Sequence, residues 1–218
     1  MTPAKRRGVF IAIEGPDGAG KSTQAAMLAE RIEREARLRV VRVREPGGTP
    51  TGERVREVLL DPKLAAMCPW TELLLYMASR AQLVEEVIRP ALAAGHAVVS
   101  DRFLLSSVVY QGYAGAIGPR PVLTLARAAF KDCLPDLTVV VDVPAAEGLS
   151  RSSRRRRGAR GGKADRVEAK GLAYAEKVRA GFLDAAKRRL AGRSVILDGR
   201  APAGEVAEDI WHEVRRVL

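Results

Sequence analysis

The sequence has little cysteine, few aromatic residues and no long apolar run, and each absence excludes a class of protein. Its two cysteines, Cys68 and Cys133, stand far apart in the sequence. Zinc-binding modules and disulfide-stapled secreted folds need several cysteines at short spacings. We therefore expect two reduced thiols that bind no metal.

Apolar runs in this chain stay well below the roughly 18 residues that a membrane-spanning helix needs. Near the start, Lys5-Arg6-Arg7 and the apolar segment 9–13 imitate a signal peptide, but that segment is too short and Glu14 ends it. These features predict a cytoplasmic protein without a membrane partner.

Aromatic residues amount to 5%, whereas hydrophobic residues amount to 47% and charged residues to 29%. The last two values are ordinary for a globular protein. The 218 residues suffice for one α/β domain with a sizeable core. Because aromatic side chains are scarce, we do not expect a surface that holds nucleic acid by stacking on its bases.

The formal net charge is +11, and much of the excess is local. One short stretch holds Arg151, Arg154, Arg155, Arg156, Arg157, Arg160, Lys163 and Arg166. Such a run is more often a solvated surface or a phosphate-binding loop than a face that binds a duplex. Because its glycines and like charges disfavour a helix, we predict that residues 150–166 form a mobile lid that orders over an anion.

Apolar, β-rich segments alternate with helical patterns along the chain. The predicted strands are Gly8–Ile13, Arg39–Val43, Ala97–Ser100, Leu137–Val143 and Ser194–Leu197. The predicted helices are Lys21–Ala36, Glu72–Ala94, Pro121–Phe130, Val167–Leu190 and Ala203–Val217. Several strands are apolar on both faces, which is typical of parallel strands covered by helices on each side. We therefore predict a three-layer α/β fold with a five-stranded parallel sheet.

The strongest motif lies between the first predicted strand and the first predicted helix. It reads Gly15-Pro16-Asp17-Gly18-Ala19-Gly20-Lys21-Ser22 and fits the P-loop pattern G-x-x-x-x-G-K-S/T. Glycines let backbone N–H groups turn toward phosphate oxygens, and the helix N-terminus adds its dipole. Lys21 can reach the β- and γ-phosphates, and the Ser22 hydroxyl can ligate Mg²⁺. The motif predicts a nucleoside triphosphate site.

A P-loop alone does not separate a kinase from a GTPase or a motor ATPase, so other residues must decide. Asp101 ends the third predicted strand, where an acid can serve the Mg²⁺ shell, cap a helix or pair with Arg102. Transfer to a phosphate acceptor needs charge neutralisation and exclusion of water, for which arginine is suited. Arg80, Arg102 and the lid arginines are the candidates, and they favour a kinase.

Several short motifs follow one another along the chain. They are Ile13 to Thr23, Arg44-Glu45-Pro46-Gly47-Gly48-Thr49, Glu72 to Arg80, Asp101-Arg102-Phe103 with Ser106-Ser107 and Tyr110-Gln111-Gly112, Pro135 to Thr138, and Asp165 to Glu168. In this order they resemble the bacterial thymidylate kinase (dTMP kinase) family over nearly the whole chain. The resemblance implies a P-loop kinase fold and Mg²⁺-dependent transfer of the terminal phosphoryl group of ATP to dTMP, giving dTDP on the way to dTTP.

The resemblance also implies an acceptor pocket. Tyr76 would stack on thymine, Arg80 would contact the thymine carbonyl, and Ser107 would face the base edge. The ring of Tyr110 would lie beside the 2′ carbon, where it would crowd a 2′-hydroxyl. The implied dTMP-binding set is Asp17, Glu45, Arg54, Tyr76, Arg80, Arg102, Ser107, Tyr110 and Gln111.

The phosphate-handling residues are implied in the same way. Arg102 and Arg54 would hold the acceptor phosphate, and Arg151 would lie over adenine. Since Gly18 stands where some members carry an arginine, the catalytic arginine is expected from the lid, with Arg155 first and Arg154 and Arg157 as alternatives. The implied catalytic set is Lys21, Asp17, Arg102 and Arg155; the ATP-binding set is Gly15, Pro16, Asp17, Gly18, Ala19, Gly20, Lys21, Ser22, Thr23 and Arg151; and the Mg²⁺ ligands, partly through water, are Ser22 and Asp101.

The chain departs from the family pattern in its lid, which is longer and more basic, and at Tyr113-Ala114-Gly115, where members often carry an arginine. We expect one domain over residues 1–218 that uses ATP and dTMP as small-molecule substrates, binds no nucleic acid and forms a homodimer, as the family usually does. Two alternatives stay open. One is a kinase for another nucleotide or nucleoside, and the other is a P-loop ATPase whose arginine-rich loop grips nucleic acid.

Overall fold

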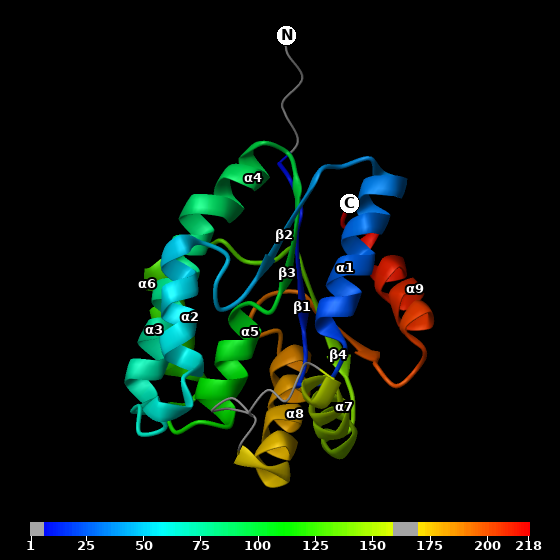
Figure 1. Ribbon diagram of the computed structural model, residues 1–218. Coiled ribbons are helices and arrows are strands. Elements are labelled where there is room, and N and C mark those ends of the chain that lie inside the picture. The colour runs from blue at the N-terminus through cyan, green and yellow to red at the C-terminus, as the bar shows by residue number, and fades with distance from the viewer. Residues whose placement is uncertain (1–6, 159–169) are drawn as a thin grey trace.

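The computed structural model describes residues 7–158 and 170–218, and a parallel β-sheet forms its centre (Figure 1). The strands are β1 (Phe10–Glu14), β2 (Val40–Arg44), β3 (Ala97–Asp101), β4 (Leu137–Asp142) and β5 (Ser194–Asp198). They lie in the order β2-β3-β1-β4-β5, and every neighbouring pair is parallel. The predicted five-stranded parallel sheet is confirmed.

Strand β1 lies at the centre of the sheet, where Ile11 is opposite Val99 of β3 and Leu137 of β4. All of its residues are buried. Side chains alternate between the two faces of a strand, so Phe10 enters one core cluster and Ile11 the other. Helices must therefore cover both faces of the sheet.

Two groups of helices form the outer layers (Figure 1). The face of Ile11 is covered by α1 (Lys21–Arg31) and α9 (Ala203–Val214). The opposite face is covered by α3 (Pro69–Leu83), α4 (Arg89–Ala93), α5 (Leu104–Ser107), α6 (Pro119–Phe130) and α8 (Leu172–Lys187). On that face the ring of Phe103 lies 4.9 Å from that of Phe10 and 5.5 Å from that of Phe130. The predicted three-layer α/β arrangement is confirmed.

Among the described residues, segments of π-helix continue regular helices at η1 (Ile32–Ala36), η3 (Val84–Ile88) and η4 (Val108–Tyr113). The helices predicted over Lys21–Ala36 and Glu72–Ala94 therefore exist but change their winding before they end. In the part of the chain that the structure describes, no helix is long and apolar enough to cross a membrane.

Some helices were not predicted, and α2 (Pro50–Leu60) is the clearest case. The hydroxyl of Thr49 caps it by accepting a hydrogen bond from the N–H of Gly52 at 2.9 Å, and Pro50 takes its first position. These start signals are in the sequence, but the glycine-rich turn just before them hid the helix. Helix α5 with η4 was also not predicted. Most of its residues are buried, polar ones included, so it lacks the apolar stripe opposite an exposed polar face that marks a surface helix.

Helix α7 (Ala145–Gly158) shows that the prediction of a non-helical lid from residue 150 was wrong over its first part. The helix starts ahead of the arginine run, and arginine itself is a good helix former. An ion pair between Arg151 and Glu147, four residues apart and 2.5 Å from each other, stabilises the helix. Residues 159–169, with the second part of the predicted lid and the start of the helix predicted at Val167, lie outside the described residues.

Candidate active site

The loop between β1 and α1 has the shape that binds phosphate. Gly15, Gly18 and Gly20 have φ angles of 138°, 77° and 89°, a region that residues with a side chain rarely adopt. At Gly18 there is also no room, since an added Cβ would lie 2.0 Å from the carbonyl oxygen of Gly148 on α7. In this conformation backbone N–H groups of the loop can cradle an anion at the N-terminus of α1.

Lys21 opens α1 and is only 7% exposed. Its Nζ donates a hydrogen bond to the carbonyl oxygen of Pro16 at 2.7 Å, which holds the side chain across the loop. Burial lowers the pKa of Lys21 to about 8, and the nearby Arg102 contributes to the same shift. A bound phosphate would add negative charge beside this buried ammonium group and so favour its charged form.

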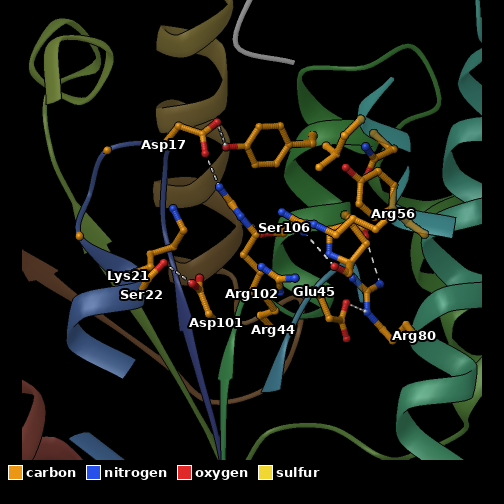
Figure 2. Close-up of a pocket in the computed structure, with 18 residues that line it drawn as sticks. Asp17, Lys21, Ser22, Arg44, Glu45, Arg56, Arg80, Asp101, Arg102 and Ser106 are labelled. Atoms are coloured by element: carbon orange, nitrogen blue, oxygen red, sulfur yellow. Dashed lines mark hydrogen bonds and ion pairs between the residues drawn. The ribbon is translucent and has the colours of Figure 1, made fainter. Parts of the chain in front are cut away.

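The side chains of Ser22 and Asp101 meet beside the loop and bring together two oxygen atoms that can ligate a metal ion (Figure 2). The Ser22 hydroxyl donates to Oδ2 of Asp101 at 2.5 Å. Within residues 7–158 and 170–218, no three or more His, Cys, Asp or Glu side chains gather to hold a metal ion. Two hard oxygen donors fit a Mg²⁺ ion that keeps most of its shell for phosphate and water.

Arg102, just after β3, joins the P-loop to the opposite wall (Figure 2). Its guanidinium donates to Oδ1 of Asp17 and to the Ser106 hydroxyl at 3.1 Å. It also lies 5.3 Å from the centre of the Tyr110 ring. The Tyr110 hydroxyl donates to Oδ2 of Asp17 at 3.1 Å. Burial and Asp17 raise the pKa of the Tyr110 phenol, so it stays a hydrogen-bond donor.

Glu14, which was not predicted as a site residue, supports this group from behind. The carboxylate is fully buried and accepts hydrogen bonds from the N–H groups of Phe103 and Ser106 at 2.8 and 3.0 Å. It also accepts one from the Ser106 hydroxyl at 2.6 Å. It thereby fixes the turn that carries Arg102, whose φ of 73° is rare for a residue with a side chain. An acid at the end of an otherwise apolar strand was the available signal.

Arg80 lies at the other end of the cavity and is 1% exposed. Its guanidinium donates to the Glu45 carboxylate at 2.6 Å, to the Ser107 hydroxyl at 3.0 Å and to the carbonyl oxygen of Phe103 at 3.0 Å. Burial raises the pKa of Glu45 to about 7, although the ion pair with Arg80 opposes this shift. The predicted residues Glu45, Arg80 and Ser107 therefore form one hydrogen-bonded cluster.

Segment η4 directs several side chains into the same cavity. A π-helix turns less per residue than an α-helix, so residues at spacings of one, four and five share a narrower face. Ser106 and Ser107 close α5, Tyr110 and Gln111 of η4 stand four and five residues after Ser106, and all four line the cavity. The change of winding at Val108 thus lets consecutive residues serve one site.

The cavity has a volume of about 330 Å³ and holds most of the predicted residues. The predicted residues in its wall are Asp17, Gly18, Gly20, Lys21, Ser22, Glu45, Tyr76, Arg80, Asp101, Arg102, Ser107, Tyr110 and Gln111. Residues in its wall that were not predicted are Arg44, Pro46, Arg56, Leu60 and Ser106. Residues drawn from several separate segments of the chain are thus brought to the carboxyl ends of β1, β2 and β3.

The structure does not bring Arg54 to the cavity, contrary to the prediction. Its side chain is 82% exposed and pairs with Glu57 at 3.1 Å. Arg56, two residues later, lines the cavity and donates to the carbonyl oxygen of Pro46 at 2.9 Å. Residues two apart on an α-helix point about 200° apart, so only one of the two arginines can face inward. The role predicted for Arg54 stays a prediction, and Arg56 is the arginine of α2 that lines the cavity.

Other predicted residues lie outside this cavity. Gly15, Pro16 and Ala19 are buried in the loop itself, and Thr23 is exposed on α1. Arg151, on α7, donates to the carbonyl oxygen of Gly199 at 3.0 Å and to Glu147.

The candidate lid arginines are described only in part. Arg154, one of the alternatives, is exposed on α7 and donates to the Ser150 hydroxyl at 3.2 Å. The side chains of Arg155 and of the other alternative, Arg157, lie outside what the structure describes. The choice among these arginines therefore stays a prediction.

Comparison with known proteins agrees with this geometry. A family model described as thymidylate kinase matches residues 13–210. A curated thymidylate kinase of Pseudomonas fluorescens is 46% identical over 203 residues, which cover 93% of this chain and 93% of the relative. A thymidylate kinase of Deinococcus radiodurans is 47% identical over 209 residues, covering 95% of this chain and 97% of the relative.

A solved structure gives the same result for the fold. The crystal structure of thymidylate kinase from Ehrlichia chaffeensis superimposes with a TM-score of 0.75 at 28% sequence identity. The match covers 95% of this chain and 99% of that one.

Proposed function

The chain belongs to the thymidylate kinase family and phosphorylates dTMP to dTDP with ATP, and we propose that the cavity described above is where the transfer takes place. One observation supports this assignment above the others. A P-loop with its lysine lies at one end of the cavity, and a polar cluster around Arg80 lies at the other. Donor and acceptor phosphates would meet between them, beside Arg102.

The acceptor would lie along the wall formed by α3 and η4. Its base would pack on Tyr76 and present its edge to Ser107, Arg80 and Gln111. Its sugar would pass the Tyr110 ring, which leaves little space for a 2′-hydroxyl. Its phosphate would reach Arg102 and Arg56, whose planar guanidinium groups suit bidentate binding of phosphate.

The donor would place its β- and γ-phosphates in the P-loop. Lys21 and the loop N–H groups would stabilise the charge that spreads over the transferring group. An ionised acceptor phosphate needs no strong general base, so the chain's task is to align two anions and to exclude water. We propose that an arginine from the lid, Arg155 first, completes this neutralisation, and that Arg151 lies at the adenine ring.

Mg²⁺ is proposed as the metal ion. Ser22 and Asp101 would hold it, Asp101 partly through water, because these are the two oxygen donors that meet beside the P-loop. When bound, the ion neutralises charge on the β- and γ-phosphates.

Three further proposals concern the whole molecule. We propose that the chain works as one domain, in the cytoplasm, and as a homodimer. The homodimer is supported by apolar side chains left exposed on adjoining helices, with Val58 of α2 at 40%, Trp70 of α3 at 51% and Leu74 of α3 at 52%.

The function is tested by ADP release with dTMP as acceptor, and a pair of variants tests the pocket. Arg56→Ala is expected to raise KM for dTMP about 30-fold, because it removes a charged hydrogen bond to the acceptor phosphate. Arg54→Ala, the matched control, is expected to stay within about twofold of wild type, because that side chain is exposed. Steady-state kinetics with varied dTMP measures both. The reverse order of effects would show that Arg54 is the phosphate ligand.

A further inference from the structure

Gln111, which lines the cavity, makes a buried hydrogen bond to a carboxylate that does not line it. Its Nε2 donates to Oε1 of Glu72 at 2.6 Å. Gln111 is 4% exposed and Glu72, in the first turn of α3, is 8% exposed. Gln111 lines the cavity, whereas Glu72 lies behind it. Nothing in the transfer of a phosphoryl group requires a carboxylate at this place.

The partner decides which end of the Gln111 amide faces the cavity. An ionised carboxylate accepts hydrogen bonds and donates none, so only the NH₂ end of the amide can bond to it. The carbonyl oxygen, Oε1, is then left for a ligand. Across the described ranges 7–158 and 170–218, no group donates a hydrogen bond to that oxygen. Glu72 thus makes Gln111 a hydrogen-bond acceptor toward the cavity.

Ser107, about one turn earlier, can offer a ligand a hydrogen-bond donor where Gln111 offers an acceptor. Its Oγ accepts a hydrogen bond from Arg80 at 3.0 Å, which leaves the hydroxyl proton for a ligand. Arg80 has donors alone. Residues 107 and 111 are four apart and both line the cavity, so an acceptor and its neighbouring donors meet at one end of it.

We propose that Glu72 is a positioning residue that fixes this acceptor-beside-donor order and so selects pyrimidines with an N3–H donor next to O4. Thymine and uracil carry that pattern. Cytosine carries its inverse, an N3 acceptor next to an amino group. The inference rests on the proposed function and adds to it, because it assigns the rejection of dCMP to a carboxylate that does not touch the substrate.

Glu72→Gln tests the proposal. An amide at position 72 can either donate or accept, so Gln111 can turn over and present its NH₂ group to the base. The KM for dTMP is expected to rise about tenfold with kcat nearly unchanged, and the preference for dTMP over dCMP in kcat/KM is expected to fall about 100-fold. The loss of a packing contact alone would weaken both substrates and leave their ratio unchanged.

The exchanged pair, Glu72→Gln with Gln111→Glu, is the matched control. The amide at position 72 then donates to the carboxylate at position 111, whose second oxygen accepts toward the cavity, and the number of charges is the same as in wild type. This double variant is expected to recover the preference for dTMP to within about fivefold of wild type. It also decides the matter if the single variant does not fold, which thermal unfolding would reveal.

Calorimetric binding of dTMP and dCMP without ATP separates this inference from the proposed function. If the wild-type protein binds dTMP more tightly than dCMP but transfers no phosphoryl group, the proposed function is contradicted. The roles of Glu72 and Gln111 are then tested by the ratio of the two affinities. A Glu72→Gln variant with the wild-type ratio of affinities would overturn the inference. So would an exchanged pair that folds but does not regain the preference.

Discussion

Replacement of Lys21 by alanine is expected to lower kcat by about 10²- to 10³-fold with ATP and dTMP, a loss typical of removing one preorganised charge partner. Lys21 is the buried cation of the P-loop, and Pro16 holds its ammonium group in place at 2.7 Å. In a site that excludes water such a charge acts more strongly than in solution. The measurement is single-turnover formation of dTDP at saturating substrates.

The fold of this variant should remain intact, because the charged lysine opposes folding. Burial lowers the pKa of Lys21 from 10.5 to about 8, so between these values the unfolded chain binds more protons than the folded protein. Wild-type stability relative to Lys21→Ala should therefore rise as the pH goes from about 8 toward 10.5. Thermal unfolding at several pH values measures this. Unchanged turnover in a folded Lys21→Ala protein would refute the role of Lys21.

The second large effect is expected at Arg102. Arg102→Ala should lower kcat/KM for dTMP by about 10³-fold. The substitution removes the planar guanidinium group that orients the acceptor phosphate, and it breaks the ion pair with Asp17. Arg102→Lys keeps the positive charge but loses the planar guanidinium group that binds phosphate in bidentate fashion. Its kcat/KM for dTMP should be only about tenfold higher than that of Arg102→Ala. Initial rates over a range of dTMP concentrations give both values.

The ATP dependence of the same variants is the internal control. Besides its bond to Asp17 of the P-loop, Arg102 bonds to Ser106 and lies over Tyr110, on the side of the cavity proposed for the acceptor. The KM for ATP should therefore change less than about threefold. A loss of ATP affinity equal to the loss of dTMP affinity would place Arg102 at the donor phosphates instead.

Much of this site could be predicted because its residues sit in local patterns. The P-loop needs its glycines, lysine and serine within one short segment, so the sequence displays it completely. The parallel strands showed themselves as runs that are apolar on both faces. The carboxyl ends of parallel strands meet at one edge, so Asp101 and Arg102 were correctly expected near the loop.

What could not be predicted depended on tertiary contacts. Glu14 looks like the end of an apolar strand, and only the fold shows that its carboxylate holds the turn before Ser106. Arg54 and Arg56 are the same residue type two positions apart, so the sequence does not distinguish them. Only the formation of helix α2 determines which one faces the cavity. Glu72 and Gln111 are 39 residues apart, and their bond exists only because α3 and η4 pack together.

The most direct test of the account is ADP release from the wild-type protein with Mg-ATP and each nucleoside monophosphate in turn. Rapid ADP release with dTMP, and little with dAMP, dGMP, dCMP or UMP, is the predicted result. This result would establish both the phosphoryl transfer and the recognition of the thymine base and the deoxyribose. ADP release that proceeds equally without any acceptor would contradict the account, because the P-loop would then serve hydrolysis and the cavity would not be an acceptor site.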